Sequence, residues 1–320
     1  MAKEKVLVTG GAGFIGSHLV DGLLQKGYQV CVLDNFSTGK EENLPNLSDI
    51  ELIKGDIRDE QAIKKAVRGA DFVLHQAALG SVPRSIDDPL TTHECNSTGT
   101  LKLLVAARDA GVKRLIYASS SSVYGNTPVL PKVETMSSSP RSPYALSKLS
   151  GEVYCQLFTS IYGLETVSLR YFNVFGPRQD EHSQYAAVIP RFASALLTDQ
   201  PITIFGDGEQ TRDFTYIENV VAANLLAMVA AQPAAGEAFN IACGGHYSIL
   251  DLSKELSKVL DRTVNVIYYN ARPGDVQDSY ADISKATKLL NYLPEISFSE
   301  GIAKTAEWFQ TQYLRVLQQK

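Results

Sequence analysis

A tyrosine and a lysine near the middle of the chain have the spacing of a proton-transfer pair. Tyr144 and Lys148 lie four residues apart, so a helix would present both side chains on one face. A nearby ammonium favours the phenolate form and lowers the pKa of a tyrosine from about 10 toward neutrality. A tyrosine with a lowered pKa can remove a proton from a hydroxyl group. Pro143 suits a helix start, which predicts that the pair opens a helix.

A run of serines precedes this pair. The apolar segment 114–118 leads directly into Ser119, Ser120, Ser121 and Ser122. Hydroxyl groups at the carboxyl end of a parallel strand face the crevice in which ligands bind. One of these hydroxyls would hydrogen-bond the reacting oxygen, whereas an isolated run of this kind is more often a polar loop.

A glycine-rich turn near the start of the chain is typical of phosphate binding. The apolar segment 5–9 runs into Gly10, Gly13 and Gly16, and the amphipathic stretch 17–26 follows. A strand, a glycine turn and a helix in this order place a pyrophosphate at the helix N-terminus. Gly10 permits the tight turn, Gly13 admits the phosphate, and Gly16 allows close packing of helix and strand. The alternative is a glycine-rich hairpin.

Acidic residues end the next two apolar runs. Asp34 closes the run 29–33, roughly 20 residues after the glycines, where a carboxylate binds ribose hydroxyls and repels a 2′-phosphate. No arginine stands beside it, so the sequence predicts NAD rather than NADP. Asp56 has two interpretations: it hydrogen-bonds the adenine amino group, or it caps the helix that begins near Asp59.

Apolar and amphipathic segments alternate from residue 4 to about 170. We expect strands at 5–9, 29–33, 50–54, 71–75, 113–118 and 164–169, and the clearest helices at 15–26, 60–68, 97–110 and 144–162. Alternation of this kind produces a parallel sheet with helices on both faces. The sequence therefore predicts an α/β protein with a Rossmann-type, doubly wound parallel sheet.

The pattern changes after Gly176, where prolines separate shorter elements. We expect short strands at 202–205 and 264–268 and helices at 190–198, 217–231, 249–260, 283–290 and 299–317. This predicts an NAD-binding domain over residues 1–175, to which the segment 215–240 returns. A smaller substrate-binding α/β region over residues 176–320 would cover the carboxyl ends of the strands.

Composition excludes several classes of protein. The 320 residues are 44% hydrophobic and 20% charged with a net charge of −5, and no lysine/arginine cluster suggests nucleic-acid binding. The four cysteines and five histidines lack metal-ligand spacing, so we expect no metal. No signal peptide is visible, and the longest apolar run, 220–231, is too short for a membrane span. We therefore expect a cytoplasmic protein.

The chain resembles the extended short-chain dehydrogenase/reductase family along nearly its whole length. The resemblance rests on Gly10-x-x-Gly13-x-x-Gly16, Asp34, Asp56, His75-Gln76-Ala77-Ala78, Asn96, Ser120, Tyr144-x-x-x-Lys148 and Tyr171-Phe172-Asn173. Within this family the chain looks most like the UDP-hexose 4-epimerases. The segments 75–85, 170–179 and 272–282 look like those of enzymes acting on UDP-N-acetylhexosamines.

The resemblance implies a role for each matching residue. Tyr144 would be the catalytic base and acid, Lys148 would tune it, and Ser120 would hydrogen-bond the sugar O4. The residues implied to bind NAD are Gly10, Gly13, Phe14, Ile15, Gly16, Asp34, Asn35, Ser37, Thr38, Gly39, Asp56, Ile57, Gln76, Ala77, Ala78, Asn96, Tyr144, Lys148 and Tyr171. The implied reaction removes the proton from O4 and the hydride from C4, which forms a bound 4-keto sugar. The sugar ring then rotates about its diphosphate, and the hydride returns to the opposite face of C4. NAD would stay bound throughout.

The resemblance also implies a UDP-sugar site. Its residues would be Gly80, Ser81, Ser120, Ser121, Ser122, Asn173, Ala187, Val188, Thr203, Phe205, Arg212, Arg272, Asp275 and Ser279. Arg212 and Arg272 would bind the diphosphate through their guanidinium groups. Phe205 would lie by the uracil, and Asp275 would bind the uridine ribose.

Two places in the sequence narrow the implied activity. Ser121 and Ser122 stand where related dehydratases carry an Asp-Glu pair and where decarboxylases keep a glutamate, and serines do not readily supply this acid–base chemistry. Ser279 stands where epimerases restricted to plain hexoses carry a tyrosine, and it leaves room for an N-acetyl group. The alternative is a one-residue shift that puts Tyr280 there.

The sequence thus predicts a 4-epimerase of UDP-GlcNAc and UDP-GalNAc, and also of UDP-Glc and UDP-Gal, in polysaccharide biosynthesis. A UDP-uronic acid 4-epimerase, another nucleotide-sugar enzyme of the family and a non-enzymatic NAD-binding sensor are the alternatives. The resemblance further implies a homodimer formed through the helices at 97–110 and 144–162. We expect no nucleic-acid or membrane partner.

Overall fold

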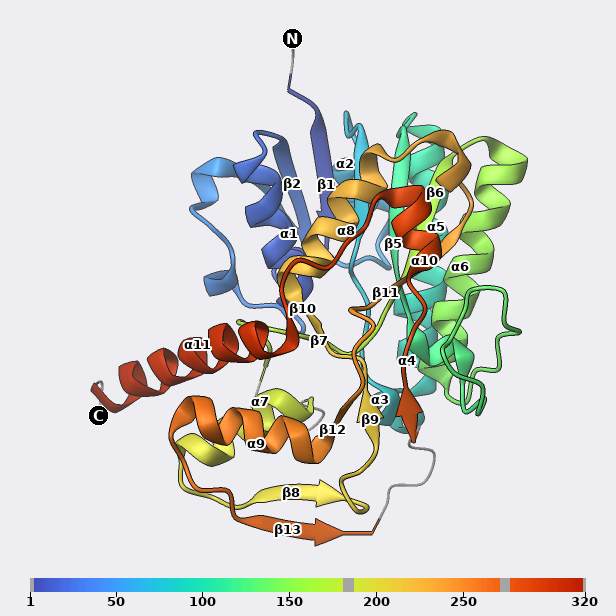
Figure 1. Ribbon diagram of the computed structural model, residues 1–320. Coiled ribbons are helices and arrows are strands. Elements are labelled where there is room, and N and C mark those ends of the chain that lie inside the picture. The colour runs from blue at the N-terminus through green and yellow to red at the C-terminus, as the bar shows by residue number, and fades with distance from the viewer. Residues whose placement is uncertain (1–2, 181–186, 271–276, 319–320) are drawn as a thin grey trace.

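A seven-stranded parallel sheet forms the centre of the protein in a computed structural model that describes residues 3–180, 187–270 and 277–318 (Figure 1). Across the sheet the strands are β3 (Ile50–Lys54), β2 (Gln29–Asp34), β1 (Lys5–Thr9), β4 (Phe72–His75), β5 (Arg114–Ser120), β6 (Glu165–Tyr171) and β11 (Ala238–Ile241). The order reverses between β1 and β4, which is the topological switch point of a doubly wound fold. The predicted fold class is confirmed.

Helices cover both faces of this sheet. The helices α1 (Phe14–Gln25) and α8 (Ile217–Val229) pack on one face, and α2 (Glu60–Ala66), α5 (Gly99–Asp109) and α6 (Pro143–Tyr162) pack on the other. The strands alternate between the two cores: Val6 and Val8 belong to the first, and Leu7 belongs to the second. Two-sided burial explains why the central strands β1, β2 and β4 are largely apolar.

The long helix α6 shows how local sequence sets the limits of an element. Its N-cap is Ser142, whose side chain accepts a hydrogen bond from the main-chain N–H of Ala145, and Pro143 occupies the first turn. Gly163 ends the helix in the left-handed conformation with φ +72°, which glycine adopts without strain. These signals place Tyr144 in the first turn, at the end of the helix that faces the carboxyl edge of the sheet.

A smaller region lies beyond the carboxyl ends of the strands. It contains the helices α7 (Val188–Leu197), α9 (Ile249–Leu260) and α11 (Phe298–Gln318), seen below the sheet in Figure 1. Its strands form three small sheets: β7 (Val174–Phe175) with β10 (Thr215–Tyr216); β8 (Ile202–Phe205) with β13 (Val266–Tyr269); and β9 (Thr211–Arg212) between β12 (Tyr247–Ser248) and β14 (Asp278–Ser279).

Short elements complete the chain. They are the helices α3 (Val82–Asp87), α4 (Pro89–His93) and α10 (Ser284–Leu290), the π-helical turn η3 (Glu94–Thr98), and the 3₁₀ turns η1 (Glu41–Asn43), η2 (Leu47–Asp49), η4 (Ser121–Tyr124) and η5 (Gln232–Ala234). The sequence did not predict α3 and α4, because each helix is too short for hydrophobic periodicity to be readable.

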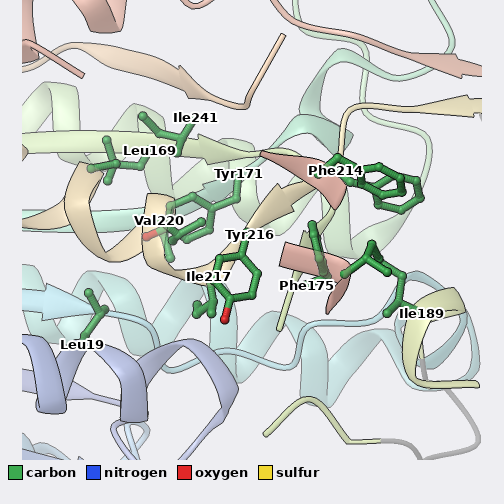
Figure 2. Close-up of a cluster of buried hydrophobic side chains, with 14 of the residues drawn as sticks. Leu19, Leu169, Tyr171, Phe175, Ile189, Phe214, Tyr216, Ile217, Val220 and Ile241 are labelled. Atoms are coloured by element: carbon green, nitrogen blue, oxygen red, sulfur yellow. The ribbon is translucent and has the colours of Figure 1, made fainter. Parts of the chain in front are cut away.

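One apolar core joins the sheet to the smaller region. Figure 2 shows Leu169 and Ile241 from the sheet, Ile217 and Val220 from α8, and Phe175 near Ile189 of α7. Phe175 also makes edge-on ring contacts with Phe214 and Tyr216. Because these side chains form a single cluster, the strands of the smaller region are anchored to the sheet by packing.

Candidate active site

A cavity of about 770 Å³ opens along the carboxyl ends of the strands. Its lining residues are Gly10, Gly13, Phe14, Ile15, Gly16, Leu33, Asp34, Asn35, Phe36, Ser37, Thr38, Gly39, Lys40, Asn43, Gly55, Ile57, Gln76, Ala77, Ala78, Leu79, Gly80, Ser81, Arg84, Cys95, Ala118, Ser119, Tyr144, Lys148, Tyr171, Arg178, Gln179, Asp180 and Ala187. Its volume is within the range of pockets that bury small-molecule ligands or cofactors. Of the nineteen residues that the resemblance assigns to NAD, Asp56 and Asn96 alone are outside this lining.

The glycine turn after β1 brings its main chain close to the start of α1. Gly10 has φ +69°, and a Cβ atom at Gly16 would lie 2.0 Å from the carbonyl oxygen of Gly10. Gly13 is the N-cap of α1, and no side chain caps this helix end. The turn therefore leaves main-chain N–H groups facing the cavity without side-chain cover, which is the arrangement that suits a pyrophosphate.

Asp34 lies at the far side of this turn and is 7% exposed. Its carboxylate accepts hydrogen bonds from the N–H groups of Ala12 at 2.9 Å and Phe36 at 2.8 Å. These contacts fix the side chain at the end of β2 while it still lines the cavity. A fixed carboxylate at this point fits the ribose of NAD and opposes the extra phosphate of NADP.

Asp56 does not cap α2, so that interpretation is wrong. The N-cap is Asp59, whose side chain accepts from the N–H of Gln61 at 2.8 Å. Asp56 instead pairs with Arg58 at 2.9 Å and accepts a hydrogen bond from Asn35 at 2.7 Å. Hydrogen bonds from Arg58 lower the pKa of Asp56 to about 2, so the carboxylate is charged.

Tyr144, Lys148 and Ser120 meet where β5 ends beside the first turn of α6. The ammonium of Lys148 donates to the carbonyl oxygen of Ala118 at 2.8 Å and lies 5.9 Å from the centre of the Tyr144 ring. Burial lowers the pKa of Lys148 to about 8, and the negative charge of Glu152 opposes that shift. The site therefore holds a lysine that loses its proton near the physiological range.

The expected pKa of Tyr144 is wrong in direction. Burial raises it above the ordinary value, and a hydrogen bond with Ser120 opposes the shift. The ammonium of Lys148 is bonded to main chain, so it does not outweigh the loss of water around the phenol. The sequence could reveal the spacing of the pair but not the burial of the phenol.

A buried ion pair connects helix α6, which carries Tyr144 and Lys148, to β6. Glu152, one turn after Lys148, accepts from Arg170 Nε at 2.9 Å and Nη2 at 2.7 Å, and both side chains are 7% exposed. The hydroxyl of Ser119 also donates to Glu152. The end of β5 is thus bonded to the same carboxylate whose charge opposes the burial-driven fall in the pKa of Lys148. The sequence did not predict this arrangement.

Two cavity-lining residues, Gln76 and Tyr171, are hydrogen-bonded to a buried amide behind them. Asn224 of α8, which is fully buried, donates to Tyr171 Oη at 2.8 Å and accepts from Gln76 Nε2 at 3.3 Å. Asn96 lies behind the wall, where it bonds the main chain of Leu79 and the hydroxyl of Ser147. Asn224 was readable in the sequence as the polar residue interrupting an apolar helix.

A segment after β7 closes the cavity over α1. His18 bonds the carbonyl oxygen of Pro177 at 3.0 Å, and Arg178 pairs with Asp21 at 2.7 Å. Arg178 has φ +66°, an uncommon value for a residue other than glycine. The partners of these pairs are 159 and 157 residues apart in sequence, so no local pattern reveals them.

Predicted substrate residues are divided between the cavity and the smaller region. Gly80, Ser81 and Ala187 line the cavity, whereas Ser120, Ser121, Ser122, Asn173, Val188, Thr203, Phe205, Arg212 and Ser279 do not. Arg272 and Asp275 lie outside the described residues. Arg84, Arg178 and Gln179 line the cavity, although the sequence did not predict them as site residues.

Arg212 and Ser279 are direct partners in the parallel pairing of β9 with β14. Register partners share one face of a sheet, while neighbours along a strand alternate between faces. Tyr280 therefore points away from the Arg212 face, and its ring lies 5.8 Å from that of His246.

The cavity as a whole fits NAD. The glycine turn suits the pyrophosphate, Asp34 suits the adenosine ribose, and Tyr144 and Lys148 lie at the other end of the same cavity. Among the described residues, no group of three or more His, Cys, Asp or Glu side chains has the arrangement to hold a metal ion. In the same part of the chain, no helix combines the length and apolar character needed to cross a membrane.

The chain belongs to the NAD dependent epimerase/dehydratase family, whose model matches residues 6–242, and the NAD prediction is confirmed. It is 43% identical to the structure of UDP-N-acetylglucosamine 4-epimerase from Methanobrevibacter ruminantium in complex with UDP-N-acetylmuramic acid, covering 98% and 100% of the two chains with a TM-score of 0.93. It is 38% identical to UDP-glucose 4-epimerase of Mycolicibacterium smegmatis over 96% and 99% of the two chains. It is 35% identical to the structure of UDP-glucuronic acid 4-epimerase from Bacillus cereus, covering 97% and 100% of the two chains with a TM-score of 0.89.

Proposed function

We propose that this protein is an NAD-dependent 4-epimerase that interconverts UDP-GlcNAc with UDP-GalNAc, and UDP-Glc with UDP-Gal. The observation that carries the proposal is the position of Tyr144 and Lys148 in the wall of the NAD cavity, with Ser120 hydrogen-bonded to Tyr144. The 43% identity to a UDP-N-acetylglucosamine 4-epimerase supports the same class of substrate.

The residues of the chain would divide the reaction as follows. Tyr144 takes the proton from O4 of the sugar, and the hydroxyl of Ser120 bonds the same oxygen and the phenol. Lys148 supplies the positive charge that favours the phenolate, which requires the lysine to keep its proton. The glycine turn and Asp34 would hold NAD, which would supply the hydride chemistry at C4. Tyr144 then gives its proton back to O4 on the inverted sugar.

The serines after β5 support epimerisation over elimination. Ser121 and Ser122 form the turn η4, directly after the strand end that carries Ser120. Elimination of water needs one acid for the leaving oxygen and one base for the carbon-bound proton. A hydroxyl with an ordinary pKa supplies neither role, so the 4-keto sugar would stay bound until hydride returns.

Ser279 supports the N-acetylated substrates. It shares a sheet face with Arg212, the residue proposed to bind the diphosphate, so it lies on the substrate side of β14. Its small side chain would leave space for an N-acetyl group at the sugar C2. Tyr280 points to the other face, which argues against a one-residue shift.

The deciding experiment uses purified protein without added cofactor. Proton NMR follows epimer formation from UDP-GlcNAc and, separately, from UDP-Glc. Interconversion of both pairs is the expected result. Turnover of UDP-Glc alone would discard the role of Ser279, and turnover of neither, even with NAD added, would discard the proposal.

A UDP-uronic acid is the second candidate substrate. Arg84 lines the cavity beside Ser81, so a cation is present that a sugar carboxylate could contact. The 35% identity to a UDP-glucuronic acid 4-epimerase is in line with this candidate. Adding UDP-glucuronic acid as a third sample in the NMR experiment separates the two, because turnover of this sugar alone would favour it.

We further infer a homodimer through α5 and α6. Val153, Leu157 and Ile161 of α6 are 46%, 42% and 64% exposed, and their spacing of four residues puts them in one stripe. Val105 of α5, 36% exposed, adds to this apolar surface. Light scattering should give twice the mass of one chain, and a monomer would refute the inference.

A further inference from the structure

Asp213 is a buried carboxylate whose hydrogen bonds come from the main chain. It is fully buried, and its Oδ1 accepts from the N–H groups of Cys243 at 3.0 Å and Gly245 at 3.3 Å. Its Oδ2 accepts from Gly244 at 3.2 Å and Ala281 at 3.3 Å. A buried charge is costly, so four hydrogen bonds to one carboxylate indicate a site that holds main chain in place.

The position of this carboxylate connects three strands. Asp213 directly follows β9, the strand that carries Arg212. The loop 243–245 leads into β12 on one side of β9, and Ala281 follows β14 on the other. Asp213 also donates its own N–H to the carbonyl oxygen of Ser279 at 2.7 Å. One residue thus bonds β14 and the loop that leads into β12, which are the two strands that flank Arg212.

We propose that Asp213 is a positioning residue that holds Arg212 and Ser279 in the register needed to bind the UDP part of the substrate. The proposal rests on the proposed function, since it deepens the account of the same site. Asp213 does not line the NAD cavity, so its effect should fall on nucleotide-sugar binding and leave NAD in place.

The surroundings of Asp213 predict how its charge responds to pH. Burial raises its pKa to about 6, and the four main-chain N–H groups oppose the shift. Among the residues that the structure describes, the thiol of Cys243 and the phenol of Tyr292 are titratable groups that interact with it. Burial raises the pKa of Cys243 to about 11 and that of Tyr292 above its ordinary value, so both stay neutral near pH 6.

Protonation would turn one oxygen of Asp213 into a donor that faces main-chain donors. The affinity for the UDP-sugar should therefore fall as the pH drops through about 6. His246 lies next to the loop 243–245 and bonds Thr211 Oγ1 at 2.7 Å, and Asp278 bonds the same hydroxyl at 2.5 Å. These two titratable side chains lie beside β9, so the test must separate them from Asp213.

The main experiment replaces Asp213 with asparagine. Asparagine keeps the shape but presents an NH₂ group to N–H donors, so hydrogen bonds that hold the main chain are lost. We expect the Kd for UDP, measured by calorimetry at pH 7.5, to rise at least about tenfold, or about 1.4 kcal/mol. The NAD content of the purified variant should equal that of the wild type.

Asp282→Asn is the matched control. Asp282 also accepts a main-chain hydrogen bond, from Ser284 at 2.7 Å, but it lies two residues before α10 and is only partly buried. It should bind UDP like the wild type. Wild-type affinity in Asp213→Asn would overturn the proposal, and so would equal loss of NAD and UDP, which would indicate a general role in folding.

A pH series on the wild type decides the matter if Asp213→Asn does not fold. The KM for UDP-GlcNAc should rise below pH 6 while NAD content stays constant, and His246→Gln should show the same rise. A KM that does not change down to pH 5, or a rise that His246→Gln abolishes, would overturn the proposal. Binding of UDP needs no turnover, so failure of the proposed epimerase activity would be seen separately.

Discussion

The ion pair between Glu152 and Arg170 predicts a large effect for Glu152→Gln. The guanidinium bonds both carboxylate oxygens, at 2.9 and 2.7 Å, and each side chain is 7% exposed. Removing one partner of such a pair costs about 3–5 kcal/mol, because the other charge stays buried. Glutamine keeps one acceptor oxygen, so we expect the lower end, about 3 kcal/mol. For a large domain this corresponds to a loss of roughly 6 °C in Tm.

The same substitution should change the pH dependence of the reaction. The charge of Glu152 opposes the fall in the pKa of Lys148, which stands at about 8. Without that charge the pKa of Lys148 falls further, and the ammonium is lost at a lower pH. The alkaline limb of kcat should therefore move to lower pH in Glu152→Gln.

Thermal unfolding and a kcat profile from pH 6 to 9.5 measure both effects. Glu237→Gln is the control, because Glu237 pairs with Lys285 at 2.7 Å with side chains 47% and 28% exposed. An exposed pair contributes about 0–1 kcal/mol, so this variant should melt within about 2 °C of the wild type. If Glu152→Gln melts like the control and keeps the wild-type profile, the account of the pair is refuted.

Three further predictions concern the site. Gly16→Ala would place a Cβ atom 2.0 Å from the carbonyl oxygen of Gly10, so bound NAD should fall at least tenfold by chromatography of the released cofactor, and full retention would contradict the geometry. Ser279→Tyr should lose turnover of UDP-GlcNAc yet keep that of UDP-Glc, and equal loss of both would disprove the role of Ser279. In the wild type, kcat should decline above pH about 8 as Lys148 loses its proton, and a rate still rising at pH 9 would show that the ammonium is not needed.

The sheet was predictable because its first six strands are short, largely apolar runs that mostly alternate with helical patterns. The predicted strand 50–54 matches β3, and the predicted helix 249–260 matches α9. The glycine turn and Asp34 were readable because their chemistry depends on neighbours along the chain. The contacts behind the site were not readable: Glu152 meets Arg170, and Asn224 meets Gln76, only after folding.

Burial explains the remaining differences. The pKa of Tyr144 depends on how much water surrounds the phenol, which spacing in sequence does not report. Asp56 was open to two interpretations because Asp59, three residues later, is an equally good cap. Residues that act through the main chain, as Asp213 does, carry no spacing signal at all.

The seventh strand of the sheet has a consequence for synthesis on the ribosome. β11 pairs with β6, with Ala238 opposite Ser168. The edge of β6 therefore stays unpaired until about seventy more residues have been synthesised. During that interval the nascent chain presents an unpaired strand and the apolar face that α8 later covers. Unpaired edges of this kind promote association between incomplete chains. A chain truncated after residue 175 would keep this exposed edge permanently, so expression of the N-terminal part should give aggregated material.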